Sequence, residues 1–242
     1  MIKLKGIILA GGTGSRLYPL TKVTNKHLLP VGKKPMIYYG IEKLVQAGIT
    51  DIMIISGTEH LGDLVSLLGS GRAFQCQLTY RVQDEAGGIA QALSLAEAFI
   101  GTDRMIVLLG DNIFESPLRP IIEAYQRQAS GAHLVLSYHE APHRFGVATL
   151  AADSIIKITE KPEIPESNYI VTGIYGYDAT VFDYIHQCRP SQRQELEITD
   201  VNNAYIQANQ CGYTLLPGWW SDAGTFDSLY SVTEHMRARP IQ

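Results

Sequence analysis

The sequence Ile7-Ile8-Leu9-Ala10-Gly11-Gly12-Thr13-Gly14-Ser15-Arg16-Leu17 decides how the rest of the chain can be interpreted. Its first four residues predict a buried strand, which the glycines end. Glycines let a backbone approach a ligand closely and expose successive N–H groups, an arrangement that binds phosphate. Arg16 can add a two-pronged contact to phosphate oxygens. The stretch therefore predicts a phosphate site after the first strand, with an ordinary glycine turn as the alternative.

The spacing of these glycines argues against two common nucleotide-binding motifs. Leu17 stands where the dinucleotide motif G-x-G-x-x-G needs its third glycine, and no Gly-Lys-Ser/Thr follows, as a P-loop requires. A nicotinamide-dependent dehydrogenase is therefore a weak alternative.

Outward from this loop, apolar runs alternate with amphipathic segments. Strands are expected over 7–10, 52–56, 78–82, 105–109 and 134–138, and helices over 34–47, 61–68, 89–99 and 118–128. This alternation predicts an α/β fold with a mostly parallel sheet covered on both faces. Ligands of such sheets bind beyond the carboxyl ends of the strands. Both Gly11 and Asp111 directly follow predicted strands.

The pattern changes near residue 138. Shorter strands are expected over 146–150, 155–159 and 169–177, and helices over 180–187, 199–208 and 226–237. The short strands predict an antiparallel layer inserted in the first half or laid over it. We expect a single domain, 1–242, with a soft internal boundary near 138.

Composition excludes several classes of protein. With 45% hydrophobic and 18% charged residues, the chain is not intrinsically disordered. The net charge of −4 disfavours nucleic-acid binding. Apolar runs are too short for a signal peptide or a membrane span, so we expect a cytoplasmic protein. The three cysteines, Cys76, Cys188 and Cys211, form no close pair, which argues against a disulfide scaffold or a cysteine zinc site.

One segment imitates a zinc-protease motif. His139-Glu140-Ala141-Pro142-His143 fits His-Glu-x-x-His, which must be helical to place both histidines on one metal. Pro142 would break that helix, and a predicted strand leads into the segment. We therefore interpret it as a loop without zinc.

A set of motifs that follow one another along the chain in the family's order resembles the sugar nucleotidyltransferase family. The set comprises the segment 9–17, Lys26, 28–31, 34–39, Gln83, 88–92, 110–114, 160–162, 171–175, 197–202 and 220–225. Any one fragment is weak evidence, but the ordered set covers nearly the whole chain and is highly specific. The resemblance implies a Rossmann-like nucleotide-binding sheet with an inserted antiparallel sugar-binding layer. Residues 1–138 would bind nucleotide, and residues 139–242 would bind sugar and close the domain.

The resemblance is nearest to members that join dTTP and glucose 1-phosphate, releasing pyrophosphate with the help of magnesium. It implies that Arg16 and Lys26 meet the triphosphate, that Lys161 holds the sugar phosphate, and that Asp111 and Asp222 bind magnesium. Nucleotide contacts are implied at Leu9, Gly11, Gly12, Thr13, Gly14, Ser15, Gln83 and Gly88, and sugar contacts at Phe145, Gly146, Glu160, Val171 and Gly173. No general base is needed, because the attacking phosphate oxygen is already anionic near neutral pH.

Several alternatives and departures remain. A uridylyl- or cytidylyltransferase, or a nucleotide-sugar sensor without turnover, would carry a similar pattern. A sensor could dispense with Arg16, Lys26, Asp111, Lys161 and Asp222, all of which are present. Phe145 replaces a common tyrosine, Ser15 a threonine and His27 a glutamine. The resemblance is to a short form without the helical tail of longer members. We also expect the chain to form a homo-oligomer.

Overall fold

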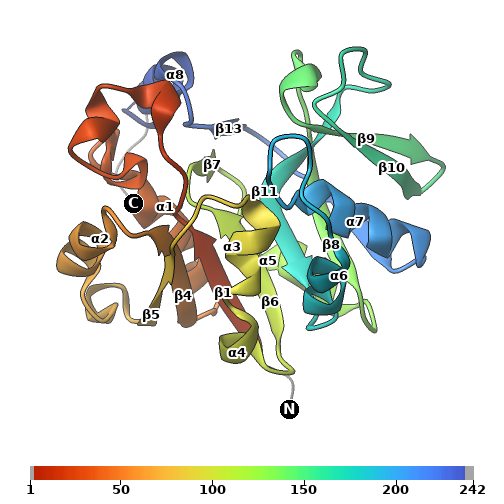
Figure 1. Cartoon of the computed structure of the whole chain (residues 1–242), viewed down its shortest axis with the longest axis horizontal. Coiled ribbons are helices and arrows are strands. Elements are labelled where there is room, and N and C mark those ends of the chain that lie inside the picture. The colour runs from red at the N-terminus through yellow and green to blue at the C-terminus, as the bar shows by residue number, and fades with distance from the viewer. Residues whose placement is uncertain (1–2, 238–242) are drawn as a thin grey trace.

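A nine-stranded sheet forms the centre of the computed structural model, which describes residues 3–237. Four parallel strands make its first half: β1 (Leu4–Leu9), β4 (Asp51–Gly57), β5 (Gln77–Gln83) and β6 (Arg104–Leu109). The strand order is β10-β9-β11-β6-β1-β4-β5, with β8 on β11 and β12 on β8 (Figure 1). The predicted mixed α/β fold with parallel central strands is confirmed.

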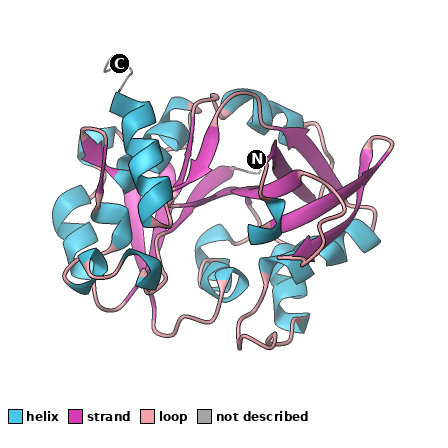
Figure 2. Cartoon of the chain, turned by 90° about the horizontal axis from the view of Figure 1, so that it is seen from above, coloured by secondary structure: helices cyan, strands magenta, loops and turns pink. Residues whose placement is uncertain are grey.

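The inner parallel strands β1, β4 and β6 are mostly apolar because both faces of the sheet are covered there, whereas the edge strand β5 is only partly buried. Along β1, Ile7 packs in one apolar cluster with α3 (Ile89–Ser94), whereas Ile8 packs in a second cluster on the other face with α1 (Met36–Gln46). Helices α2 (Leu61–Leu68) and α5 (Arg119–Gln126) add to the second cluster. Seen from above, the strands run through the middle with helices on both sides (Figure 2).

The antiparallel strands extend this sheet and do not lie over it. Strand β11 pairs antiparallel with β6, so the second half continues the edge of the first. The elements of this half are β8 (Ala132–Tyr138), β9 (Gly146–Ala151), β10 (Ser154–Glu160), β11 (Tyr169–Tyr177), α6 (Val181–Gln187), α7 (Ile198–Gln207) and β12 (Cys211–Leu215). Of the two arrangements predicted, an overlying layer is therefore wrong.

Several short elements escaped prediction or differ from it. The helix expected over 34–47 begins at Met36, because β3 (Lys34–Pro35) pairs with β2 (Pro30–Val31). The helix expected over 89–99 divides into α3 and α4 (Glu97–Ile100). Strands β7 (Asn112–Phe114) and β13 (Trp220–Asp222) pair antiparallel, and α8 (Phe226–Arg237) follows. Five 3-10 turns complete the list: 15–17, 20–22, 26–28, 72–74 and 142–144.

The segment 139–143, which imitates a zinc motif, forms no α-helix, and the sequence-based expectation of a non-helical segment is confirmed. A single 3-10 turn, Pro142–Arg144, occupies it, and His143 is exposed. Within residues 3–237 no helix has the length and apolar character needed to cross a membrane.

The outer edge of β10 is closed by a side chain of α7. The amide of Asn203 accepts from the backbone N–H of Ile158 at 2.9 Å and donates to the carbonyl of Ile158 at 2.8 Å. This amide therefore takes the place of a neighbouring strand, and it fixes α7 against the hairpin of β9 and β10.

Candidate functional site

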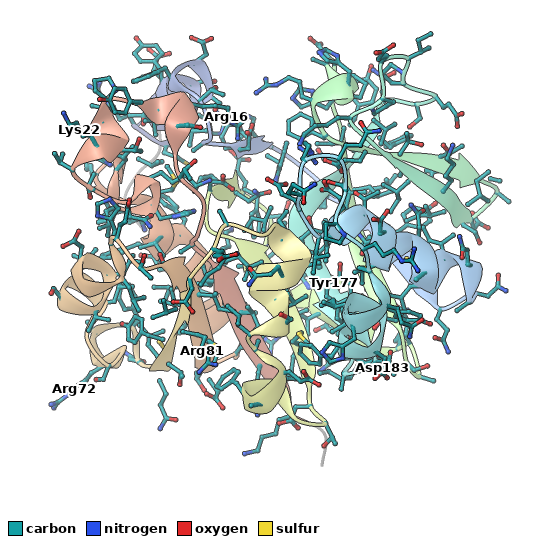
Figure 3. All side chains as sticks on the ribbon, in the orientation of Figure 1. Arg16, Lys22, Arg72, Arg81, Tyr177 and Asp183 are labelled. Atoms are coloured by element: carbon teal, nitrogen blue, oxygen red, sulfur yellow. The ribbon has the colours of Figure 1, made fainter. Side chains whose placement is uncertain are left out.

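The predicted site residues gather at the carboxyl ends of the strands. Two cavities lie there, of about 190 Å³ and 240 Å³. Arg16 and Lys22 are at this end of the molecule, whereas Arg72 and Asp183 are at the other (Figure 3). A larger hollow of about 860 Å³ lies at the amino ends of the strands and contains none of the predicted site residues. Most of the predicted site residues line the two smaller cavities.

The first cavity, here called the nucleotide cavity, is built from loops that follow β1, β4 and β5. Predicted residues lining it are Gly12, Thr13, Lys26 and Gln83. Lining residues that sequence reasoning missed are Thr21, Thr24, Asn25, Gly57, Thr58, Glu59, His60, Asp84 and Ala86. Most of these missed residues follow a strand directly, which is the signal that could have found them.

Local contacts fix the backbone conformation of the glycine loop. Gly14 has a φ of +62°, and a Cβ there would lie 2.7 Å from the methyl group of Thr21. The hydroxyl of Thr21 donates to the carbonyl of Gly14 at 2.8 Å. Gly12, with φ +91°, has nothing within 4 Å of a Cβ position. The backbone at Gly12 is therefore free to meet a ligand.

Gln83 is placed by its neighbours on both sides. Its Nε2 donates to Oε1 of Gln91 at 2.6 Å, and its Oε1 lies 2.5 Å from where a Cβ on Gly11 would be. Gly88 begins α3 with φ +96°, where a Cβ would lie 2.6 Å from the carbonyl of Leu196. Leu9 is buried in the core, so only its backbone can reach a ligand, and Ser15 is exposed at the start of a 3-10 turn.

Lys26 and Asp111 form an ion pair where the two cavities meet. Lys26 Nζ lies 2.6 Å from Asp111 Oδ2, and Asn112 Nδ2 donates to Oδ1 at 3.0 Å. Burial alone would raise the pKa of Asp111, but the Lys26 charge and the hydrogen bonds from Lys26 and Asn112 hold it well below its usual range. Asp111 is therefore an anion, and its neighbour His27 is neutral, since burial and the Lys26 charge lower the histidine pKa to about 3.

Asp222 is brought beside Asp111 by the β7–β13 pair. Asp222 lies opposite Asn112 in that pair, and the N–H of Ala223 donates to the carbonyl of Asp111 at 2.8 Å. Burial and then the Asp111 charge raise the pKa of Asp222, opposed by Arg144, Arg16 and Lys26. Two adjacent carboxylates in a buried setting favour a bound cation.

The second cavity, here called the sugar cavity, is lined by residues from both halves of the chain. Predicted residues in it are Arg16, Asp111, Phe145, Gly146, Glu160, Lys161, Val171, Gly173 and Asp222. The residues missed are Ile89, Leu109, Asn112, Arg144, Tyr175, Glu197, Ile198, Thr199, Asn202 and Trp220. All the predicted sugar contacts thus lie in one cavity.

Glu160 and Lys161 form the polar wall of the sugar cavity. Glu160 accepts from the hydroxyl of Thr199 at 2.7 Å and lies 3.2 Å from Lys161 Nζ and 3.5 Å from Arg193. Lys161 has a φ of 42°, uncommon for a residue other than glycine, and its N–H donates to the carbonyl of Phe145 at 3.0 Å. Such strain is typical of functional sites.

An aromatic group and Asn112 form another part of the lining. The ring of Phe145 lies 5.6 Å from Trp220 and 4.9 Å from His139, edge to face. Asn112 Oδ1 accepts from Trp220 Nε1 and from the N–H of Gly173, both at 2.8 Å. Sequence reasoning gave Asn112 no role, although its place directly after Asp111 was a usable signal.

Comparisons with known proteins show which family the chain belongs to. Residues 5–239 match the family model described as nucleotidyl transferase. A glucose-1-phosphate thymidylyltransferase from Neisseria meningitidis is 40% identical over 238 residues, 97% of this chain and 83% of that protein. The protein of that name from Xanthomonas campestris is 42% identical over 241 residues, 96% of this chain and 80% of that one.

Two solved structures are also similar to this chain. A Bacillus anthracis structure provisionally named a glucose-1-phosphate thymidylyltransferase, in complex with a sucrose, is 57% identical with a TM-score of 0.95 over 99% of this chain and 98% of that one. A UDP-glucose pyrophosphorylase with UDP-glucose, 24% identical, has a TM-score of 0.85 over 99% of this chain and 100% of that one, which shows a shared fold.

Proposed function

This chain belongs to the nucleotidyl transferase family, and from that premise we propose that it joins dTTP and glucose 1-phosphate into dTDP-glucose, with release of pyrophosphate. One observation carries the proposal. The Lys26–Asp111 pair lies where a glycine-loop cavity meets a cavity with Glu160 and Lys161, so two phosphate-bearing substrates can meet there.

In the proposed reaction, an oxygen of the sugar phosphate attacks the α-phosphorus of dTTP. One P–O bond forms, and the bond from the α-phosphorus to the bridging oxygen breaks, so pyrophosphate leaves with that electron pair. The barrier is the repulsion and the alignment of two polyanions. Arg16 and Lys26 supply positive charge at the α-phosphate, where negative charge grows in the transition state. No group of the protein needs to remove a proton.

The sugar cavity would hold the nucleophile. Lys161 would bind the phosphate of glucose 1-phosphate, and Glu160 would accept hydrogen bonds from sugar hydroxyls. The hydroxyl of Thr199 already orients Glu160. This orientation before binding favours one pose of the sugar.

Asp111 and Asp222 fit a magnesium ion by their chemistry. Both are carboxylates, the hard oxygen donors that magnesium prefers. The described residues contain no group of three or more His, Cys, Asp or Glu side chains that could hold a metal ion by themselves. Two protein ligands suit an ion that keeps several waters and is shared with substrate phosphates. When bound, magnesium would neutralise the α-phosphate and the departing pyrophosphate.

A substrate matrix tests the proposal. Pyrophosphate release is measured for dTTP, UTP, CTP, ATP and GTP against several sugar 1-phosphates. We expect dTTP with glucose 1-phosphate to be best and UTP slower, because a methyl-sized contact discriminates only about 10- to 200-fold. Robust use of CTP would indicate a cytidylyltransferase. Binding without any pyrophosphate release would indicate a sensor.

Two further expectations belong to the proposal. We propose that the enzyme acts in the cytoplasm, where its nucleotide substrate is made, and that it forms a homo-oligomer. Large exposed apolar residues, among them Val23 and Tyr230, support a subunit contact. Analytical ultracentrifugation checks the assembly, and a monomer at micromolar concentration would contradict it.

A further inference from the structure

Three polar side chains, those of Asn25, His27 and Ser56, are buried together behind Lys26. They are 7%, 1% and 0% exposed, respectively. Burying polar groups at this depth costs free energy unless each one is hydrogen-bonded. Their hydrogen bonds therefore indicate what this cluster holds in place.

The amide of Asn25 ties the Lys26 turn to two parallel strands. Its Nδ2 donates to the carbonyl of Ala10, at the end of β1, at 3.1 Å and to Ser56 Oγ, on β4, at 3.2 Å. The hydroxyl of Ser56 donates to the same carbonyl at 2.9 Å. A backbone carbonyl can only accept, so the Nδ2 of Asn25 must face Ala10 and the Oδ1 must face away.

The Oδ1 atom of Asn25 binds His27 twice. It accepts from the backbone N–H of His27 at 2.8 Å and lies 2.6 Å from Nδ1 of the ring. An amide oxygen has no proton to give, so Nδ1 of His27 carries the hydrogen. Lys26 stands between these two anchored residues and reaches Asp111 at 2.6 Å.

We propose that Asn25 and His27 are positioning residues, which act through Lys26 by fixing its turn so that Nζ is aimed at the reacting phosphate. This inference rests on the proposed role of Lys26. A lysine side chain is long and flexible, so its backbone must be fixed if the charge is to be placed accurately. A displacement of about 1 Å can lower a rate on the order of 100-fold.

A double-mutant cycle tests the proposal. Asn25→Ala should lower kcat about 10- to 100-fold with KM for both substrates little changed, because a misplaced charge weakens the transition state more than the ground state. Adding Asn25→Ala to Lys26→Ala should lower kcat no further. An additional loss equal to that of the single variant would overturn the proposal. The matched control is His133→Gln, a buried hydrogen-bonded residue outside both cavities, which should lower Tm and leave kcat unchanged.

The outcomes separate the two levels of inference. Wild-type turnover of Lys26→Ala would overturn both the proposed role of Lys26 and the proposal that Asn25 and His27 position it. A strong loss for Lys26→Ala together with normal kcat for Asn25→Ala would overturn the positioning alone.

Two measurements apply even if Asn25→Ala fails to fold. His27→Asn places an amide nitrogen where Nδ1 lies and should keep most of the turnover, whereas His27→Leu has no hydrogen-bond donor there and should lose it. Equal turnover of the two variants would contradict the proposal. Independently of activity, the ¹H–¹⁵N spectrum of the His27 ring should show the hydrogen on Nδ1. A hydrogen on Nε2 instead would remove the bond on which the inference depends.

Discussion

The nucleotide side and the sugar side of the site are built in different ways. The nucleotide cavity is lined mostly by loops that follow parallel strands. The sugar cavity takes many of its side chains from β10, β11, β13 and α7, although Phe145 and Lys161 lie in bends beside these elements. A loop can move without disturbing the sheet, whereas a strand cannot. We expect the nucleotide side to adapt on binding and the sugar side to be formed in advance.

The largest expected effect is at the junction of the two sides. Asp111→Asn should lower turnover about 1000-fold or more, beyond the loss of one pre-organised electrostatic group, because this carboxylate lines the sugar cavity and also pairs with Lys26 of the nucleotide cavity. The Tm should change little, since the shape is kept. Asp183→Asn, exposed at the opposite end, is the control and should behave as wild type (Figure 3). Activity of Asp111→Asn within tenfold of wild type would remove Asp111 from the mechanism.

Arg16→Ala should remove positive charge from the proposed α-phosphate position, although Arg16 lines the sugar cavity. Removing one donor at a developing charge costs about 100- to 1000-fold in kcat, and KM for dTTP should change little. The guanidinium lies 3.0 Å from where a Cβ on Gly224 would be, so it points toward the Asp222 segment. Lys22→Ala, an exposed cation of the same segment, is the control. A higher KM with normal kcat would make Arg16 a simple binding contact.

Lys161→Ala should break the sugar side alone. We expect KM for glucose 1-phosphate to rise about 10- to 100-fold, the value of one charge-assisted hydrogen bond, while KM for dTTP stays the same. Lys157→Ala, exposed on the strand β10 that leads to Lys161, is the matched control. If KM for dTTP rose instead, the two sides would be assigned the wrong way round.

The smallest effect concerns stability away from both sides. Burial, and then the charges of Arg127 and Arg104, lower the pKa of His133 to about 4 from the ordinary 6.5. The unfolded chain then binds more protons between these values, so the free energy of unfolding falls as pH drops from about 6.5 to 4, by at most about 1.4 kcal/mol per pH unit. Urea unfolding of wild type and His133→Gln at several pH values checks this. Parallel pH curves for the two proteins would contradict it.

The two sides also differed in how far the sequence predicted them. Gly11 and Asp111 could be assigned to the site because each follows an uninterrupted apolar strand, and parallel strands end at one edge. Asp222 could not be placed in that way. It reaches Asp111 through the three-residue pair β7–β13, which is too short to leave a periodic signal, and only the family resemblance pointed to it. Trp220 lies on the same short strand, and Asn202 lies on the predicted helix α7, but tertiary packing decides that both reach the sugar cavity.

The Asn203 amide on the outer edge of β10 affects the tendency of the protein to aggregate. The last strand of a sheet presents unpaired N–H and C=O groups that can recruit a strand from another molecule and begin aggregation. Asn203 occupies one such pair of groups at Ile158. Because the same amide helps to hold α7, which carries Thr199 and Asn202 of the sugar cavity, we expect Asn203→Ala to lower both solubility and sugar binding. Selection for either property would therefore preserve the other.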